Sequence, residues 1–301
     1  MVCAVWAVAD SLTRVYSKMD GHVVPTVGSE KPPVLVEDVS AYFEVATMET
    51  TGGKVWDAAR ALLQFFRARP HLLEKGDLPL SLVELGSGTG FLGMSLARDF
   101  EVEMTLTEMI QGGALRWLER NVQRNRDAGL LLPSLRTAPL DWSWVDGDAR
   151  AHDDEKVHGD EIAGGSASAD AEAAAAIFGR EWQLVIGSDL VYNETGARML
   201  PRVLSRLLGG GSHSRGRAGA VAFYAHTLNR FEFLDKDFFG ALRAEGLRYE
   251  QAWPDRSQHE QQQQEEEEPF FGFSGDLFPE MRVVVFRIEA DPDWQLRSHE
   301  E

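Results

Sequence analysis

A glycine-rich segment is the first place where residue types and spacing indicate chemistry. The apolar run Leu82–Leu85 breaks into Gly86-Ser87-Gly88-Thr89-Gly90, and a helical pattern follows from Phe91. A glycine turn between a buried strand and a helix lets a ligand approach the backbone at the carboxyl edge of an α/β sheet. We therefore expect Gly86, Ser87 and Gly88 to bind a nucleotide-like ligand.

The spacing around this turn narrows the class of ligand. A dinucleotide fingerprint requires glycine or alanine at position 91, where this chain has Phe91. Glu108 follows the next apolar run, Glu101–Thr107, at a distance suited to a carboxylate that binds the two hydroxyls of a ribose. Its alternative role is that of an acid at a helix N-terminus. The pattern disfavours a nicotinamide or flavin cofactor, and with it a dehydrogenase.

A second group of polar residues follows the fourth apolar run, Trp182–Ser188. Asp189 and Tyr192 come directly after it, at the edge where open α/β sheets bind ligands. The Asp189 carboxylate could hold an incoming ammonium group, and Tyr192 could wall a channel; the alternative for Asp189 is an N-cap of the helix expected from Thr195. His226 follows the fifth run near the same edge, and a structural histidine is the favoured interpretation over a substrate contact.

The elements that must position these residues are short runs rich in Val, Leu and Ile that alternate with helical patterns. This alternation predicts an α/β, Rossmann-like seven-stranded sheet with helices on both faces. Because no helical pattern separates the last two strands, we expect them to be antiparallel neighbours in a mostly parallel sheet with one antiparallel strand. The expected strands are Ser81–Leu85, Glu101–Thr107, Leu135–Leu140, Trp182–Ser188, Ala218–Ala225, Leu247–Gln251 and Met281–Ile288.

Helical spacing predicts five helices and a simple domain organisation. We expect one domain over residues 34–290, preceded by an N-terminal extension over 1–33 and followed by an acidic tail over 291–301. Disordered acidic insertions are expected at about 146–180, where the alanine run Ala173–Ala176 suggests a short helix, and at 254–268; residues 209–217 suggest a flexible loop. The helices are expected over Lys54–Arg69, Gly90–Arg98, Gln111–Arg126, Thr195–Leu208 and Asp235–Glu245.

Composition excludes several classes of function. The net charge is −18, but residues 146–172, 255–268 and 289–301 carry 16 of these charges, so the expected folded part is nearly neutral. The sequence has no stretch in which basic residues alternate with aromatic ones, a pattern that would indicate nucleic-acid binding. With Cys3 as the only cysteine and scattered histidines, we expect no disulfide framework and no metal site. No apolar run is long enough to span a bilayer, and Val2–Ala9 lacks the basic residues of a signal peptide.

Several motifs, in this order, resemble the seven-β-strand protein lysine methyltransferases of the methyltransferase-21-like family. The resemblance covers roughly residues 34–288. It implies the class I methyltransferase fold, S-adenosylmethionine as cofactor, and a protein substrate such as a chaperone or translation factor. We further expect a monomer located in the cytoplasm or nucleus, because nothing in the sequence requires an oligomer and the single cysteine fits an intracellular protein. The motifs are Gly53–Ala59, Glu84–Gly90, Leu106–Glu108, Asn121–Asn125, Leu140–Trp142 and Gly187–Tyr192.

The resemblance also assigns roles in cofactor binding. Trp56 matches the tryptophan that lines the cofactor pocket, and the loop from Gly86 to Gly88 matches the loop under the methionine and ribose. Glu108 matches the acidic ribose ligand, which is more often aspartate in this family, and Trp142 matches the aromatic residue beside the adenine. Ser188 stands where the family often has alanine. Indole rings suit a sulfonium cation and a flat base, although either tryptophan could instead belong to the core.

For the methyl transfer, the resemblance assigns catalytic roles to Asp189 and Tyr192. A protein lysine is the expected acceptor, while a protein histidine or a small molecule remains open. A non-catalytic adaptor that uses its acidic insertions to bind a basic partner is the alternative from another class. Chemistry on nucleic-acid bases is disfavoured, because the chain lacks an Asn-Pro-Pro-aromatic motif and a Pro-Cys nucleophile.

Overall fold

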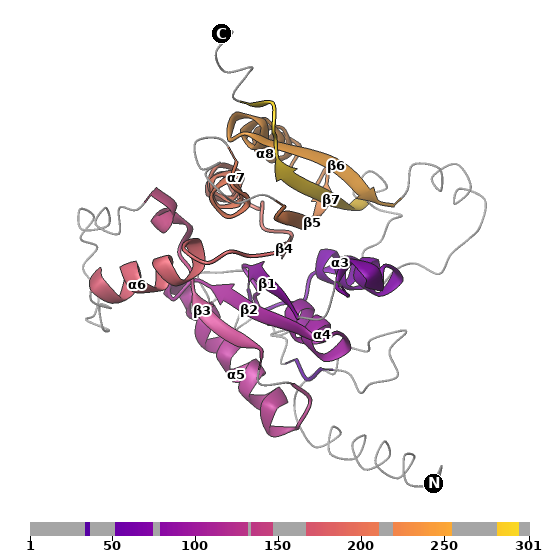
Figure 1. The fold of residues 1–301 in the computed structure, drawn as a ribbon, viewed down its shortest axis with the longest axis vertical. Helices are drawn as coiled ribbons and strands as arrows, with labels where there is room; N and C mark the ends of the chain where they lie inside the picture. The colour runs from indigo at the N-terminus through magenta and orange to yellow at the C-terminus, as the bar shows by residue number, and fades with distance from the viewer. Residues whose placement is uncertain are drawn as a thin grey trace, which may run out of the picture.

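The computed structural model describes residues 34–36, 52–74, 79–131, 134–146, 167–210, 219–254 and 282–294. Within these ranges, seven strands form one sheet in the order β3-β2-β1-β4-β5-β7-β6 (Figure 1). Strand β7 runs antiparallel to both of its neighbours, and the other pairs are parallel. The predicted fold class and all seven expected strands are confirmed. The strands are β1 Leu80–Leu85, β2 Val102–Glu108, β3 Arg136–Pro139, β4 Leu184–Ser188, β5 Val221–Leu228, β6 Leu247–Trp253 and β7 Arg282–Ala290.

The parallel register gathers strand ends at one edge of the sheet. Strand β1 pairs with β2 on one side, where Glu84 lies opposite Leu106, and with β4 on the other, where Leu85 lies opposite Gly187. The chain order reverses across β1, so the turns after β1 and β4 diverge. Such a switch point leaves a crevice at the carboxyl ends of the strands.

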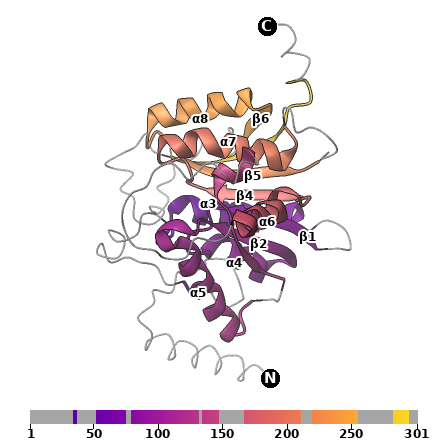
Figure 2. The same ribbon diagram turned by 90° about the vertical axis from the view of Figure 1, so that its left-hand side faces the viewer.

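Six α-helices cover the two faces of the sheet in the described part of the chain. Helices α3, α4 and α5 share a core with side chains such as Leu82 and Phe223, whereas α6, α7 and α8 pack on the alternate residues, such as Val83 and Tyr224. Figure 2 shows α7 and α8 side by side over their face of the sheet. The bounds are α3 Asp57–Ala68, α4 Phe91–Asp99, α5 Ala114–Asp127, α6 Ala167–Phe178, α7 Glu194–Leu208 and α8 Glu232–Ala244, with short 3-10 helices at η1 Pro70–Leu72, η2 Gln111–Gly113 and η3 Trp142–Asp146.

An aromatic cluster packs the C-terminal half of α3 against the sheet. Phe65 and Phe66 of α3 contact Phe223 of β5, with ring centroids 5.1 and 5.5 Å apart. Aromatic pairs at this spacing add to the free energy of apolar burial. The packing holds α3, whose N-cap is Trp56, against β5.

The acidic insertion predicted at about 146–180 contains an ordered helix. Helix α6 lies in the second half of this segment, and its last two residues, Ile177 and Phe178, are buried in the core. The Trp182 indole N–H donates to the Ile177 carbonyl at 2.8 Å. The helix suggested by the alanine run Ala173–Ala176 is therefore present, and apolar residues at the end of that run anchor it.

Other predictions fall outside the described residues. These include the extension over 1–33, the acidic run over 257–268 and most of the tail over 291–301. Among the residues that the structure does describe, no helix is long and apolar enough to cross a membrane.

The segment 34–36 is tied to α5 by one buried asparagine. The Asn125 side chain accepts a hydrogen bond from Leu35 N at 2.7 Å and donates to Leu35 O at 2.6 Å and to Asn121 O at 2.8 Å. Asn121 in turn donates to Thr89 O at 2.9 Å, which links the helix to the glycine loop. The two asparagines thus join α5 to its surroundings on both sides.

We expect Asn125→Ala to lower the free energy of unfolding by about 2–3 kcal/mol, because buried backbone groups lose their partner. Denaturant titration measures this loss. Gln123→Ala is the matched control on the same helix, since Gln123 bonds Asp127 at an exposed position, and we expect it to cost less than about 0.5 kcal/mol. Equal losses in the two variants would contradict this role.

Candidate active site

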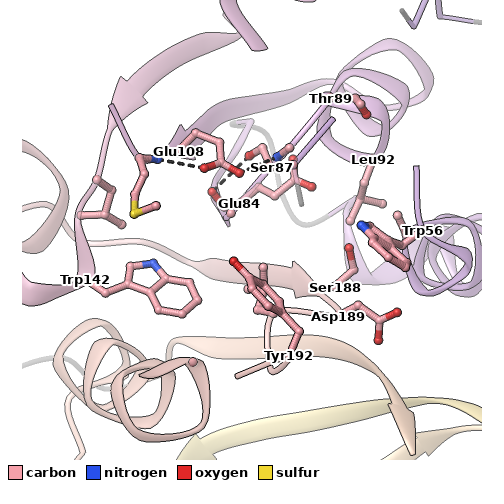
Figure 3. Close-up of a pocket in the computed structure, with 18 of the residues that line it drawn as sticks. Trp56, Glu84, Ser87, Thr89, Leu92, Glu108, Trp142, Ser188, Asp189 and Tyr192 are labelled. Carbon is pink, nitrogen blue, oxygen red and sulfur yellow. Dashed lines mark hydrogen bonds between the residues drawn. The ribbon is translucent and has the colours of Figure 1, made fainter. Parts of the chain in front are cut away.

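A pocket of about 520 Å³ opens at the carboxyl edge of the sheet. This volume is in the range of small-molecule sites. In Figure 3, Glu108 and Trp142 lie on one side, Trp56 and Asp189 lie on the other, and Tyr192 lies between them. All of the residues predicted for the site line this pocket: Trp56, Gly86, Ser87, Gly88, Glu108, Trp142, Ser188, Asp189 and Tyr192.

The turn after β1 requires glycine at two positions. Gly86 and Gly88 have φ values of +55° and +54°, in the left-handed region that side chains disfavour. A Cβ on Gly86 would lie 2.5 Å from Leu190 Cδ2, and one on Gly88 would lie 2.8 Å from Gly52 O. The turn is therefore packed against the segment after β4 on one side and the segment before α3 on the other.

Ser87 is buried and its hydroxyl is directed into the protein. Its Oγ accepts from Thr107 N at 3.1 Å, while Thr107 Oγ1 donates to Glu84 O at 2.7 Å. These bonds join the ends of β1 and β2. Ser87 thus shapes the turn through its hydroxyl, although it also lines the pocket.

Glu108, at the end of β2, reaches across to the glycine turn. One carboxylate oxygen accepts from Gly88 N at 2.9 Å and the other from Met109 N at 2.8 Å. Burial raises the pKa of this carboxyl, while the two N–H donors lower it. Since a carboxylate has about four acceptor positions, both oxygens retain capacity for a ligand hydroxyl.

The two predicted tryptophans are partly buried at opposite sides of the pocket. Trp142 begins η3 just after Leu140, whose N–H donates to Glu108 O at 2.9 Å. The Trp56 ring lies 5.3 Å from Lys54 Nζ and 5.0 Å from Arg230 Cζ. The indole of Trp56 is thus already flanked by two cations, and Trp142 presents its ring to the side of the pocket that holds Glu108 (Figure 3).

Asp189 lies after β4 with φ +50° and is 8% exposed. Its carboxylate accepts from Thr227 N at 2.8 Å and from Thr227 Oγ1 at 2.9 Å, and it lies 3.1 Å from Arg230 Nη1. The N-cap of α7 is Asn193, whose side chain accepts from Gly196 N at 2.7 Å. The alternative role of Asp189 as a helix cap is therefore excluded.

Three other residues lie close to Asp189 or support the backbone beside it. His226 is 2% exposed and bonds both Asp235 and Tyr224, which agrees with the structural histidine favoured from the sequence. Thr227 and Arg230 were not expected at the site. Thr227 lies near the end of β5, the neighbour of β4, and Arg230 follows that strand, so the predicted sheet edge was the signal that could have indicated them.

Glu84 is a further pocket residue that the sequence analysis did not single out as part of the site. Its side chain is buried, and Oε2 accepts from Gly93 N at 3.1 Å. Burial raises the pKa of this carboxyl to about 8, against the opposing effect of hydrogen bonds from Ser87 and Gly93. Glu84 is therefore mostly protonated at neutral pH. An acid inside an otherwise apolar strand was the available signal.

The Glu84 pKa predicts a pH dependence of stability. Because the folded value is raised, the unfolded chain loses the proton first, and stability falls as pH rises from about 4.5 toward 8. We expect Glu84→Gln to match the wild type near pH 5 and to exceed it by on the order of 3 kcal/mol near pH 7. Denaturant titrations across this range measure the difference, since other groups titrate alike in both proteins. Parallel stability curves would show that Glu84 is not protonated in the fold.

Residues 38–155 match a family described as lysine methyltransferase. This chain is a methyltransferase. The match agrees with the predicted resemblance, and the family implies S-adenosylmethionine as the cofactor of this methyltransferase. The matched range includes Trp56, Glu108 and Trp142 and ends before Asp189.

Solved structures show distant similarity to this methyltransferase. A methyltransferase from Pyrococcus furiosus is 11% identical with a TM-score of 0.41, over 77% of this chain and 83% of that one. A protein from Agrobacterium tumefaciens described as a predicted O-methyltransferase is 15% identical with a TM-score of 0.42, over 79% and 82%. Likenesses of this degree carry no argument about the substrate. No curated protein sequence matches the chain.

The pocket fits the chemistry of S-adenosylmethionine. A carboxylate at the glycine turn suits the ribose, the Trp142 ring suits the adenine, and the turn leaves room for close backbone approach. When bound, this cofactor supplies a methyl group on a sulfonium centre. Within the described residues, no group of three or more His, Cys, Asp or Glu side chains could hold a metal ion.

Proposed function

We propose that this methyltransferase transfers a methyl group to the side-chain amine of a lysine in a protein. The observation that carries the proposal is a buried carboxylate, Asp189, in the cofactor pocket on the side opposite Glu108. A carboxylate beside the acceptor favours a lysine, because it can bind the incoming ammonium group before that group releases its proton to solvent and becomes the neutral nucleophile. The family description as lysine methyltransferase supports the same acceptor.

In this proposal, the predicted cofactor residues that line the pocket hold the cofactor. Glu108 binds the ribose hydroxyls, Trp142 contacts the adenine, and Trp56 lines the pocket at the methionine end. The Gly86–Gly88 turn and Ser188 form the floor between them. The domain that carries these residues spans 34–290, between the extension and the acidic tail.

Asp189 orients the acceptor amine in this proposal. Thr227 fixes both carboxylate oxygens, and Oδ1 keeps one acceptor position beyond the bond from Thr227 N. Methyl transfer requires a neutral amine aligned with the departing sulfur, so orientation and exclusion of water contribute more than covalent chemistry. Tyr192, 39% exposed, walls the entrance through which the lysine side chain enters.

The cofactor role of Glu108 predicts a loss of affinity. We expect Glu108→Ala to weaken binding of S-adenosylhomocysteine about 100-fold, because the ribose loses a charged partner and the N–H groups of Gly88 and Met109 lose their acceptor. Calorimetric titration measures this affinity. Glu103→Ala on the same strand, where Glu103 pairs with Arg180 at the surface, should bind as the wild type does. Wild-type affinity in Glu108→Ala would show that Glu108 does not bind the ribose.

The acceptor role of Asp189 predicts a loss of transfer. We expect a lysate incubated with radiolabelled S-adenosylmethionine and the enzyme to yield a discrete labelled protein band, and Asp189→Asn to reduce that label by about 100-fold. Acid hydrolysis of the band should release methyl-lysine. Asp237→Asn, at an exposed position of α8, is the matched control and should leave the label unchanged.

Other outcomes of this experiment would overturn the proposal. Methyl-histidine in the band would assign a different acceptor, and label in small molecules alone would exclude a protein substrate. Cofactor binding without any transfer would favour an adaptor. Because Asp189→Asn leaves Arg230 without its carboxylate partner, thermal unfolding and S-adenosylhomocysteine binding must first show that the variant is folded.

A further inference from the structure

The buried tyrosine of β5 holds the backbone of the segment after β4. The Tyr224 hydroxyl accepts hydrogen bonds from Leu190 N at 3.0 Å and from Val191 N at 3.3 Å. Tyr224 is 2% exposed, and burial raises the pKa of its phenol well above the usual value. The phenol therefore stays protonated. Two lone pairs are used by the N–H groups, so its own proton must be donated elsewhere.

His226 accepts the hydrogen bond that the Tyr224 hydroxyl donates, and His226 is itself held by Asp235. His226 Nδ1 lies 3.4 Å from the Tyr224 hydroxyl, and His226 Nε2 lies 2.8 Å from Asp235 Oδ1. Asp235 Oδ2 accepts from Asn229 N at 2.8 Å, so this carboxylate acts as an acceptor on both sides. The consistent arrangement has Nε2–H donating to Asp235 and Nδ1 accepting from Tyr224, a tautomer assigned from its partners.

The segment held in this way touches the glycine turn. Leu190 packs so closely that a Cβ on Gly86 would lie 2.5 Å from Cδ2, and a Cβ on Gly187 would lie 2.8 Å from Cδ1. Asp189 and Tyr192 flank the held residues on either side, and both line the pocket. Leu190 therefore links the conformation of the segment after β4 to that of the turn after β1.

We propose that Tyr224, His226 and Asp235, here called the Tyr224 relay, are positioning residues that hold the segment Asp189–Tyr192 and, through Leu190, the glycine turn in the conformation that binds the cofactor. The relay itself does not line the pocket. It acts through the backbone N–H groups of Leu190 and Val191. This role is independent of whether the acceptor is a lysine, so it does not rest on the proposed function.

Tyr224→Phe tests the first link of the relay. It keeps the ring contacts with His226 and Phe238 and removes only the hydroxyl. We expect S-adenosylhomocysteine to bind about tenfold more weakly by calorimetry, and the amides of Leu190 and Val191 to exchange with deuterium faster than in the wild type. Tyr249→Phe is the matched control. Tyr249 lies on β6, does not line the pocket, and its hydroxyl accepts from Arg243 of α8, so both properties should remain unchanged.

Two variants of His226 separate positioning from simple packing. In His226→Asn, the side-chain oxygen can take the place of Nδ1 and accept from Tyr224, so we expect affinity within about threefold of the wild type. His226→Leu fills the site without an acceptor and should lose about tenfold. If Tyr224→Phe fails to fold, the difference in affinity between these two variants tests the positioning role by itself.

The proposal is overturned by any of three results. Wild-type affinity and amide protection in a folded Tyr224→Phe would show that the hydroxyl does not position the segment. Equal affinities in His226→Asn and His226→Leu would reduce the histidine to a packing role. A loss in Tyr249→Phe as large as in Tyr224→Phe would attribute the effect to general destabilisation.

Discussion

The parallel pairing of β1 with both β2 and β4 is the constraint on which the rest of the site depends. This pairing places the carboxyl ends of three strands at one edge, and the reversal of chain order at β1 separates the turns that follow β1 and β4. A crevice must then lie between these turns. Among the residues proposed to bind the cofactor, the Gly86–Gly88 turn follows β1 and Glu108 ends β2, whereas the proposed acceptor residues Asp189 and Tyr192 follow β4.

A single kind of interaction then fixes each turn at this edge. At this edge, side chains accept hydrogen bonds from backbone N–H groups. Glu108 accepts from Gly88 and Met109, Asp189 accepts from Thr227, and the Tyr224 hydroxyl accepts from Leu190 and Val191. Buried N–H groups need such partners, and each bond restrains the backbone from which ligand contacts are made. The pocket is therefore shaped before any ligand enters.

Much of this arrangement could be predicted from the sequence. Apolar runs and helical spacing predict the seven strands, and the glycine turn, Glu108 and Asp189 follow strand ends in a way that indicates their common edge. Partners distant in sequence could not be predicted. The pairing of Asp189 with Arg230 depends on how the segments after β4 and β5 meet, and that of Leu190 with Tyr224 depends on how the segment after β4 lies against β5; no local pattern encodes these contacts. Likewise, the order of α6 depends on burial of Ile177 and Phe178 at its end.

We propose that the pocket holds S-adenosylmethionine between Glu108 and Asp189. A crystal structure of the enzyme with S-adenosylhomocysteine tests this placement most directly. We expect ribose hydroxyls within hydrogen-bond distance of the Glu108 carboxylate, the adenine beside Trp142, and the sulfur directed toward Asp189 and Tyr192. A ligand whose ribose lies away from Glu108, or whose sulfur faces away from the segment after β4, would contradict it.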